Sequence, residues 1–220
     1  MVFPDSTRKA EQYDISGQML ANVAGELSGI DPSTFSSDWS ATMVKLATAD
    51  DISEDHPEYF ESGAGLLRYL ELNPLQGALV RSADGLLAAN IASSTATTIR
   101  GHFSARRREA LHSVGLLRHQ SPEDLRVNDY LWSQLGSLAV VGIHLDSFID
   151  ARKDSVKLPQ FSAQQLAYGS MTELLRTARQ IDGGTFAAIL RQTHAFGFDA
   201  YMAKKLVKPL LRTKPALTAV

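Results

Sequence analysis

Two acidic clusters contain the residues of this chain whose types and spacing are best suited to chemistry. The first occupies residues 50–55, and the second consists of aspartates at four-residue steps, Asp146, Asp150 and Asp154. Residues four apart lie on one face of a helix, so each cluster forms a ridge of carboxylates. Like charges at this spacing repel by roughly a few tenths of a kcal/mol per exposed pair, so stability does not call for them.

Closely spaced carboxylates of this kind are suited to binding hard divalent cations. Mg²⁺ takes oxygen ligands, usually one or two carboxylates per ion, and completes its octahedron with water and substrate phosphate. Two ridges that face each other across a helical bundle would therefore hold a diphosphate through magnesium. The metal ligands that we predict are the acidic side chains of both clusters: Asp50, Asp51, Glu54, Asp55, Asp146, Asp150 and Asp154.

Composition places the chain among ordinary globular proteins. The 220 residues are 44% apolar with a net charge of −2, which predicts a single domain over 1–220 and gives no electrostatic footprint for nucleic acid. The absence of cysteine excludes disulfides and thiolate metal sites, and the six histidines show no paired zinc-ligand spacing. No apolar run is long enough to span a membrane or to form a signal core, so we expect a cytoplasmic protein. A homodimer is compatible with this sequence.

The elements that must position the acidic ridges read with helical periodicity throughout, which predicts an all-α antiparallel bundle. The clearest helix start is Ser121-Pro122-Glu123-Asp124, with a serine cap, proline at the first helical position and acids in the first turn. From there no strong breaker precedes Pro159, which predicts one helix of roughly 30 residues that carries the second cluster. The other predicted helices cover 6–27, 34–55, 58–72, 75–100, 105–117, 163–181, 185–196 and 198–211.

Both ridges continue into apolar stripes on their own helices. Ala47 and Met43 lie one and two turns before Asp51, while Gly142 precedes Asp146 and Ile143 lies beside Asp150. A pocket with carboxylates at its rim and aliphatic walls below suits a ligand with a diphosphate head and a hydrocarbon tail.

The first cluster resembles a known motif. Asp51-Ile52-Ser53-Glu54-Asp55 is similar to the first aspartate-rich motif, Asp-x-x-Glu-Asp, of the squalene and phytoene synthases, which have the class I isoprenoid synthase fold. The second cluster resembles the second motif of that family, and the segments 156–159 and 166–169 resemble its leucine-proline segment and the glycine turn beyond it. The resemblance covers about residues 35–60 and 125–175, in the same order along the chain.

This resemblance implies ionisation chemistry. Magnesium would bridge a prenyl diphosphate to both motifs, with Asp51, Asp55, Asp146 and Asp150 as the catalytic residues, and an allylic carbocation would form in a dry cavity. Capture of the cation by a second prenyl unit makes a prenyltransferase, and capture by a distal double bond makes a terpene cyclase. The usual cyclase form of the second motif is not visible here, so transfer ranks ahead of cyclisation.

Several basic and aromatic side chains complete the predicted substrate site. The residues that could bind phosphate oxygens or line the pocket are Arg68, Arg100, Lys153, Lys204 and Tyr168.

Two other classes of protein fit parts of the sequence. Lys153 stands where the family commonly has glutamate, which favours a fold relative without catalytic activity that serves as a binding or assembly factor. The segment 162–167 resembles the first helix of a helix-turn-helix regulator, although the net charge argues against DNA binding.

Overall fold

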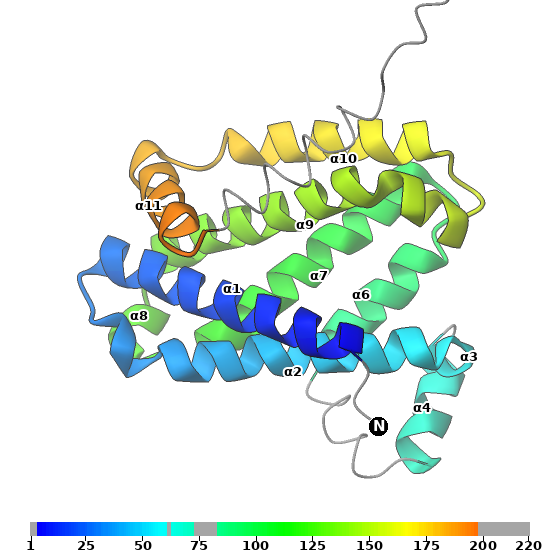
Figure 1. Ribbon diagram of the computed structural model, residues 1–220, viewed down its shortest axis with the longest axis horizontal. Coiled ribbons are helices and arrows are strands. Elements are labelled where there is room, and N and C mark those ends of the chain that lie inside the picture. Colours follow the sequence, from blue (N-terminus) through cyan, green and yellow to red (C-terminus); the bar gives the residue numbers. More distant parts are fainter. Residues whose placement is uncertain (1–3, 61–62, 73–82, 198–220) are drawn as a thin grey trace, which may run out of the picture.

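In the computed structural model, every regular element of the described residues, which are 4–60, 63–72 and 83–197, is a helix. The all-α class is therefore confirmed (Figure 1). The elements in chain order are α1 (Pro4–Ser28), the short 3₁₀ helix η1 (Pro32–Thr34), α2 (Ser36–Asp55), α3 (Pro57–Phe60), α4 (Gly63–Leu72), α6 (Asp84–Ser94), α7 (Ile99–His119), α8 (Glu123–Arg126), α9 (Asp129–Lys157), α10 (Ala163–Ala178) and α11 (Gly183–Ala195).

Helices that are neighbours in the chain pack as pairs, and α7 joins these pairs. The pairs are α1 with α2, α6 with α7, and α9 with α10. Helix α7 also packs against α2, α9 and α10, and Figure 1 shows it crossing between the α1–α2 pair and α9. Because α7 touches both helices that carry acidic clusters, its side chains can mediate between them. Within the described residues, no helix is long and apolar enough to cross a membrane.

The largest apolar cluster lies where α1, α2, α7, α9 and α11 meet. Its centre is an aromatic pair from the two acidic helices, Trp39 of α2 and Trp132 of α9, with ring centroids 5.5 Å apart. The Trp39 indole N–H donates to Ser121 Oγ (3.1 Å), and that of Trp132 donates to the Leu125 carbonyl (2.8 Å). Both large rings are therefore buried with their polar atoms satisfied. This packing fixes α2 against α9 well away from their carboxylates.

Two helix starts differ from the prediction because side-chain caps prevail over other local signals. Gly101 does not end a helix: Thr98 accepts a hydrogen bond from the Gly101 N–H (3.1 Å) and begins α7, so Gly101 lies in the first turn. Ser121 does not cap a long helix, because its hydroxyl donates to the Leu117 carbonyl (2.8 Å). Only the single turn of α8 follows, and α9 starts instead at Asn128, whose side chain accepts from the Leu131 N–H (3.1 Å).

Other predicted bounds hold within a few residues. α1, α2, α10 and α11 match their predicted ranges closely, while the predicted helix 58–72 is divided into α3 and α4. The predicted helix 198–211 and the first part of 75–100 lie outside the described residues.

Helix α10 corrects one interpretation of the segment around Gly169. The helix is continuous from Ala163 to Ala178, so Gly169 forms no turn, and the segment 162–167 begins a helix of 16 residues. Gly169 instead gives Phe103 of α7 room to approach, because a Cβ built there would lie 2.2 Å from the Phe103 ring. The glycine therefore serves helix packing.

Candidate functional site

The first acidic cluster forms the last residues of α2. The helix ends where the N–H of His56 donates to the Ile52 carbonyl (3.2 Å) and Pro57 follows. Asp50 is half-buried, and its Oδ1 accepts a hydrogen bond from Asn90 of α6 (2.9 Å). The side chains of Asp51, Glu54 and Asp55 lie outside the part that the structure describes.

The second cluster lies on the C-terminal part of α9. Asp146 is exposed, and Asp150 and Asp154 are half-buried. Partial burial raises the pKa of Asp154, against the opposing effect of Arg106, and the charges of Asp150 and Asp146 raise it further. The three carboxylates therefore act on one another along one face of the helix.

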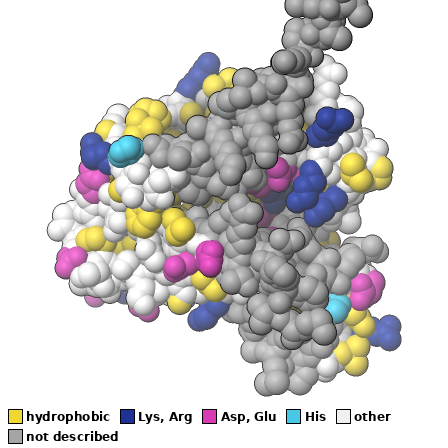
Figure 2. Space-filling model, viewed as in Figure 1, with side chains coloured by type: hydrophobic (Ala, Val, Ile, Leu, Met, Phe, Trp, Pro, Cys, Tyr) yellow, Lys and Arg dark blue, Asp and Glu magenta, His cyan; other side chains and the backbone are white. Residues whose placement is uncertain are grey.

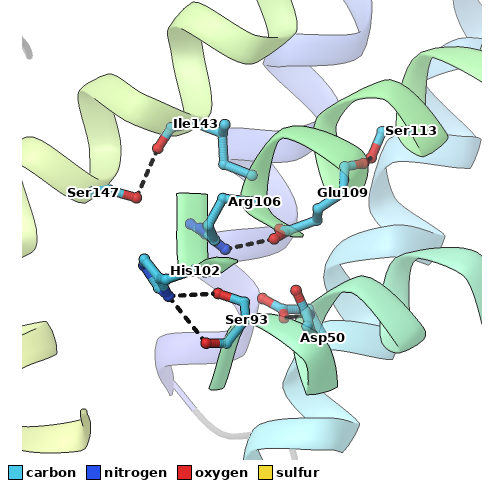
Figure 3. A network of polar contacts seen from close by, with 9 residues as sticks. Asp50, Ser93, His102, Arg106, Glu109, Ser113, Ile143 and Ser147 are labelled. Carbon is cyan, nitrogen blue, oxygen red and sulfur yellow. Dashed lines mark hydrogen bonds and ion pairs between the residues drawn. The ribbon is translucent and has the colours of Figure 1, made fainter. Parts of the chain in front are cut away.

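An ion pair on α7 lies between the two clusters. Arg106 Nη1 donates to Glu109 Oε2 at 2.7 Å, and the two side chains are only 22% and 12% exposed. Figure 3 shows this pair between Ile143 on α9 and Asp50 on α2. In the space-filling view, acidic and basic side chains lie next to one another near the middle of the face shown (Figure 2).

Both acidic helices act on the same guanidinium. Burial alone would lower the pKa of Arg106, but Glu109, Asp146, Asp50 and the phenol of Tyr13 outweigh it and keep the pKa above its ordinary value. The structure thus brings Asp50 and Asp146, which are far apart in the sequence, to one cationic side chain.

Glu109 adds a carboxyl group to this set. Burial raises its pKa to about 7 despite the neighbouring Arg106, with further contributions from Asp50 and Asp146. Because burial is the largest cause, the raised pKa chiefly reflects the removal of this carboxyl group from water.

Neither Arg106 nor Glu109 belongs to the site predicted from the sequence. A signal for them exists, since both lie on the buried side of α7, next to Ala105 and Ala110. A charged pair three residues apart among buried positions of a helix needs a partner inside the fold.

The predicted apolar walls are placed differently on the two helices. On α2, Ala47 is buried and Met43 packs against two of the apolar clusters. On α9, Ile143 is half-buried, but Gly142 is exposed, and a Cβ at that position would meet nothing within 4 Å. The stripe that ends in Asp146 therefore faces outward at Gly142 instead of into packed core.

The predicted phosphate-binding residues are not gathered at one place. Arg68 is exposed on α4 and Tyr168 is 78% exposed on α10, and these helices lie on opposite sides of the molecule (Figure 1). Arg100 is exposed in the first turn of α7, and Lys153 is exposed on α9. Lys204 lies outside the described residues. The basic side chain that the structure does place among the carboxylates is Arg106.

Two buried histidines lie near the same part of α7. His102 Nδ1 is 2.9 Å from Ser93 Oγ and 3.1 Å from the Ser93 carbonyl, which ties α6 to α7 (Figure 3). His144 of α9 has no exposed surface, and neither ring nitrogen has a hydrogen-bond partner. Burial lowers its pKa to about 4, and Arg106, Arg107, His102 and Arg176 add to this effect. This imidazole is held neutral inside the fold.

The donors around Arg106 fit a hard cation by their chemistry, because they are carboxylate oxygens. Among the side chains that the structure describes, no three His, Cys, Asp or Glu groups are arranged to hold one metal ion. The side chains of Asp51, Glu54 and Asp55 do not belong to that set.

Comparison of the chain with protein-family models, with curated proteins and with solved structures found no match. The function must therefore be argued from the site itself.

Proposed function

We propose that this chain is a Mg²⁺-dependent class I isoprenoid synthase, which ionises an allylic prenyl diphosphate. The carbocation is transferred to a second prenyl unit or cyclised. The observation that supports this function best is that Asp50 from α2 and Asp146 from α9 both act electrostatically on Arg106 of α7, which packs against both helices. Two acidic clusters that share one diphosphate would likewise have to act on a common point.

The residues that would hold magnesium come from both acidic helices. They are Asp50, Asp51, Glu54 and Asp55 on α2 and Asp146, Asp150 and Asp154 on α9. Burial is the main cause of the raised pKa values of Glu109 and Asp154, and the positive charge of a bound cation would favour the ionised form of both groups. When bound, magnesium would neutralise the charge that develops on the departing diphosphate.

The chain's own residues supply the rest of the environment. On the helix that ends in the first cluster, Ala47 is buried and Met43 packs against two apolar clusters, so apolar core that excludes water adjoins the acidic residues. Arg106 supplies a fixed positive charge beside the site, where an anionic head group is electrostatically favoured.

A second function is supported by the same ion pair. Arg106 and Glu109 already satisfy part of the charge between α2 and α9, and Lys153 replaces a carboxylate of the second motif. A helical binding or assembly protein that has kept the fold without the reaction would have these features. Turnover separates the two functions.

The test is release of diphosphate from farnesyl diphosphate with Mg²⁺. Asp51→Asn and Asp150→Asn keep the side-chain shape and remove an anionic ligand, so each variant should remain folded. Their turnover should fall about a hundredfold or more, which corresponds to about 2.7 kcal/mol of transition-state stabilisation. Lys153→Ala, at an exposed position of the same helix, is the control and should change turnover by less than about tenfold.

Each outcome has a clear meaning. Equal release by the wild type and Asp51→Asn would remove the acidic clusters from the mechanism. If the wild type releases no diphosphate but is stabilised against heat by geranyl, farnesyl or geranylgeranyl diphosphate with Mg²⁺, the binding protein is the correct function. No release and no stabilisation would refute both.

A further inference from the structure

Arg106 pairs with a carboxylate of its own helix and acts electrostatically on carboxylates of two other helices. Its guanidinium donates to Glu109 on α7, and it interacts electrostatically with Asp50 on α2 and with Asp146 and Asp154 on α9. A guanidinium keeps its charge at any pH relevant to proteins, so it is a permanent cation that acts on these carboxylates. Removal of this cation would leave partly buried carboxylates without their compensating charge.

The position of Arg106 determines what the acidic residues do when no metal is bound. Repulsion between the carboxylates of α2 and α9 would push these helices apart, and Trp39 and Trp132 hold them together only at a distance from the acids. α7 packs against both helices and carries Arg106 to the place where the repulsion would act.

We propose that Arg106 is a built-in counter-ion of this site, which holds the acidic ends of α2 and α9 together without metal and competes with a divalent cation for the same carboxylates. The proposal rests on the proposed function, because it takes the divalent cation to be the Mg²⁺ ion of that function. Arg106 is here a positioning residue, and its effect on metal binding distinguishes this role from simple packing.

The experiment measures the melting temperature of three variants with and without Mg²⁺, at matched ionic strength. Arg106→Met keeps the aliphatic stem and removes the charge, so it should lower the melting temperature by about 6 °C or more. Mg²⁺ should recover at least about half of that loss, while it raises the wild type by about 1 °C or less, the shift expected for a ligand near its Kd.

Two further variants make the test specific. Arg106→Lys keeps the positive charge but loses the planar guanidinium, so its melting temperature should fall less than that of Arg106→Met. Its rise in melting temperature with Mg²⁺ should lie between those of the wild type and Arg106→Met. Arg108→Met removes an equal charge from an exposed position two residues away, and it should respond to Mg²⁺ as the wild type does. If Arg106→Met does not fold, Arg106→Lys tests the proposal instead. Mg²⁺ should then raise the melting temperature of Arg106→Lys more than that of the wild type, because this difference arises only if Arg106 competes with the cation.

The results also separate this inference from the proposed function. The counter-ion proposal would be refuted if Mg²⁺ changed the melting temperature equally for the wild type, Arg106→Lys and any folded Arg106→Met. This holds whatever the turnover of the wild type. A strong Mg²⁺ rescue together with a wild type that never releases diphosphate would uphold the counter-ion and refute the enzyme.

Discussion

Replacement of His144 by leucine should remove much of the acid sensitivity of this fold. The imidazole is fully buried between α9 and α7, with its ring 5.5 Å from that of Phe103, and both nitrogens lack partners. Leucine has a similar volume and no polar atom to desolvate. The variant should therefore be at least as stable as the wild type at pH 7.

The size of the pH effect follows from the shift of this group. The pKa of His144 is about 4 in the folded protein and 6.5 in the unfolded chain, so below pH 6.5 the unfolded chain binds a proton that the folded protein does not. Stability therefore falls as the pH is lowered from 6.5 to 4. The loss is about 2 kcal/mol between pH 7 and pH 5, and about 3 kcal/mol once the pH is below 4.

Glu109 acts in the opposite direction. Its pKa of about 7 in the folded protein exceeds its ordinary value of 4.5, so its contribution is favourable at low pH and is lost as the pH rises through 7. Because wild type and variant share this carboxyl group, the difference between them isolates His144.

The assay is urea unfolding at pH 7 and pH 5 for wild type, His144→Leu and the control His119→Leu. His119 is exposed, so its replacement removes an imidazole that is not buried and should leave in place the loss of stability that His144 causes. If wild type and His144→Leu lose the same free energy between these pH values, the imidazole is not held neutral by burial and the reasoning is refuted.

Two other predictions test packing and helix boundaries. Gly169→Ala should lower the free energy of unfolding by about 1–3 kcal/mol in urea, because its Cβ would lie 2.2 Å from the Phe103 ring. The same change at Gly142, where a Cβ meets open space, should instead stabilise α9 by about 0.5–1 kcal/mol, and two effects of equal sign would contradict the α7–α10 contact. Asn128→Ala should cost about 1 kcal/mol in the same assay because it removes the cap of α9, and an unchanged stability would mean that α9 does not begin there.

The class of the fold and the positions of the acidic clusters could be predicted because they depend on local patterns. Helical periodicity predicts an all-α protein, and the breaker at Pro57 predicts the end of α2. Where two local signals competed, the sequence did not reveal which would prevail. Thr98 and Gly101 both mark a boundary, and only the hydrogen bond between them shows that the threonine begins α7.

The composition of the site depended on tertiary contacts that local patterns do not contain. Arg106 lies in a run of three arginines that resembles an ordinary surface patch. Its role follows from the packing of α7 against both α2 and α9, which no spacing along the chain encodes. The side-chain chemistry of Arg68 and Tyr168 suits phosphate binding, but the fold places their helices on opposite sides of the molecule.

The charge balance around Arg106 has a consequence for the order of binding at this site. Mg²⁺ alone would have to draw carboxylates from the guanidinium, and a diphosphate alone would add negative charge beside Asp50, Glu109 and Asp146. If cation and diphosphate arrived together, the metal would offset part of the negative charge that the diphosphate adds, and Arg106 would have an anion nearby. Cooperative binding of metal and substrate would thus follow from the number of fixed charges on α2, α7 and α9, without any movement of the helices.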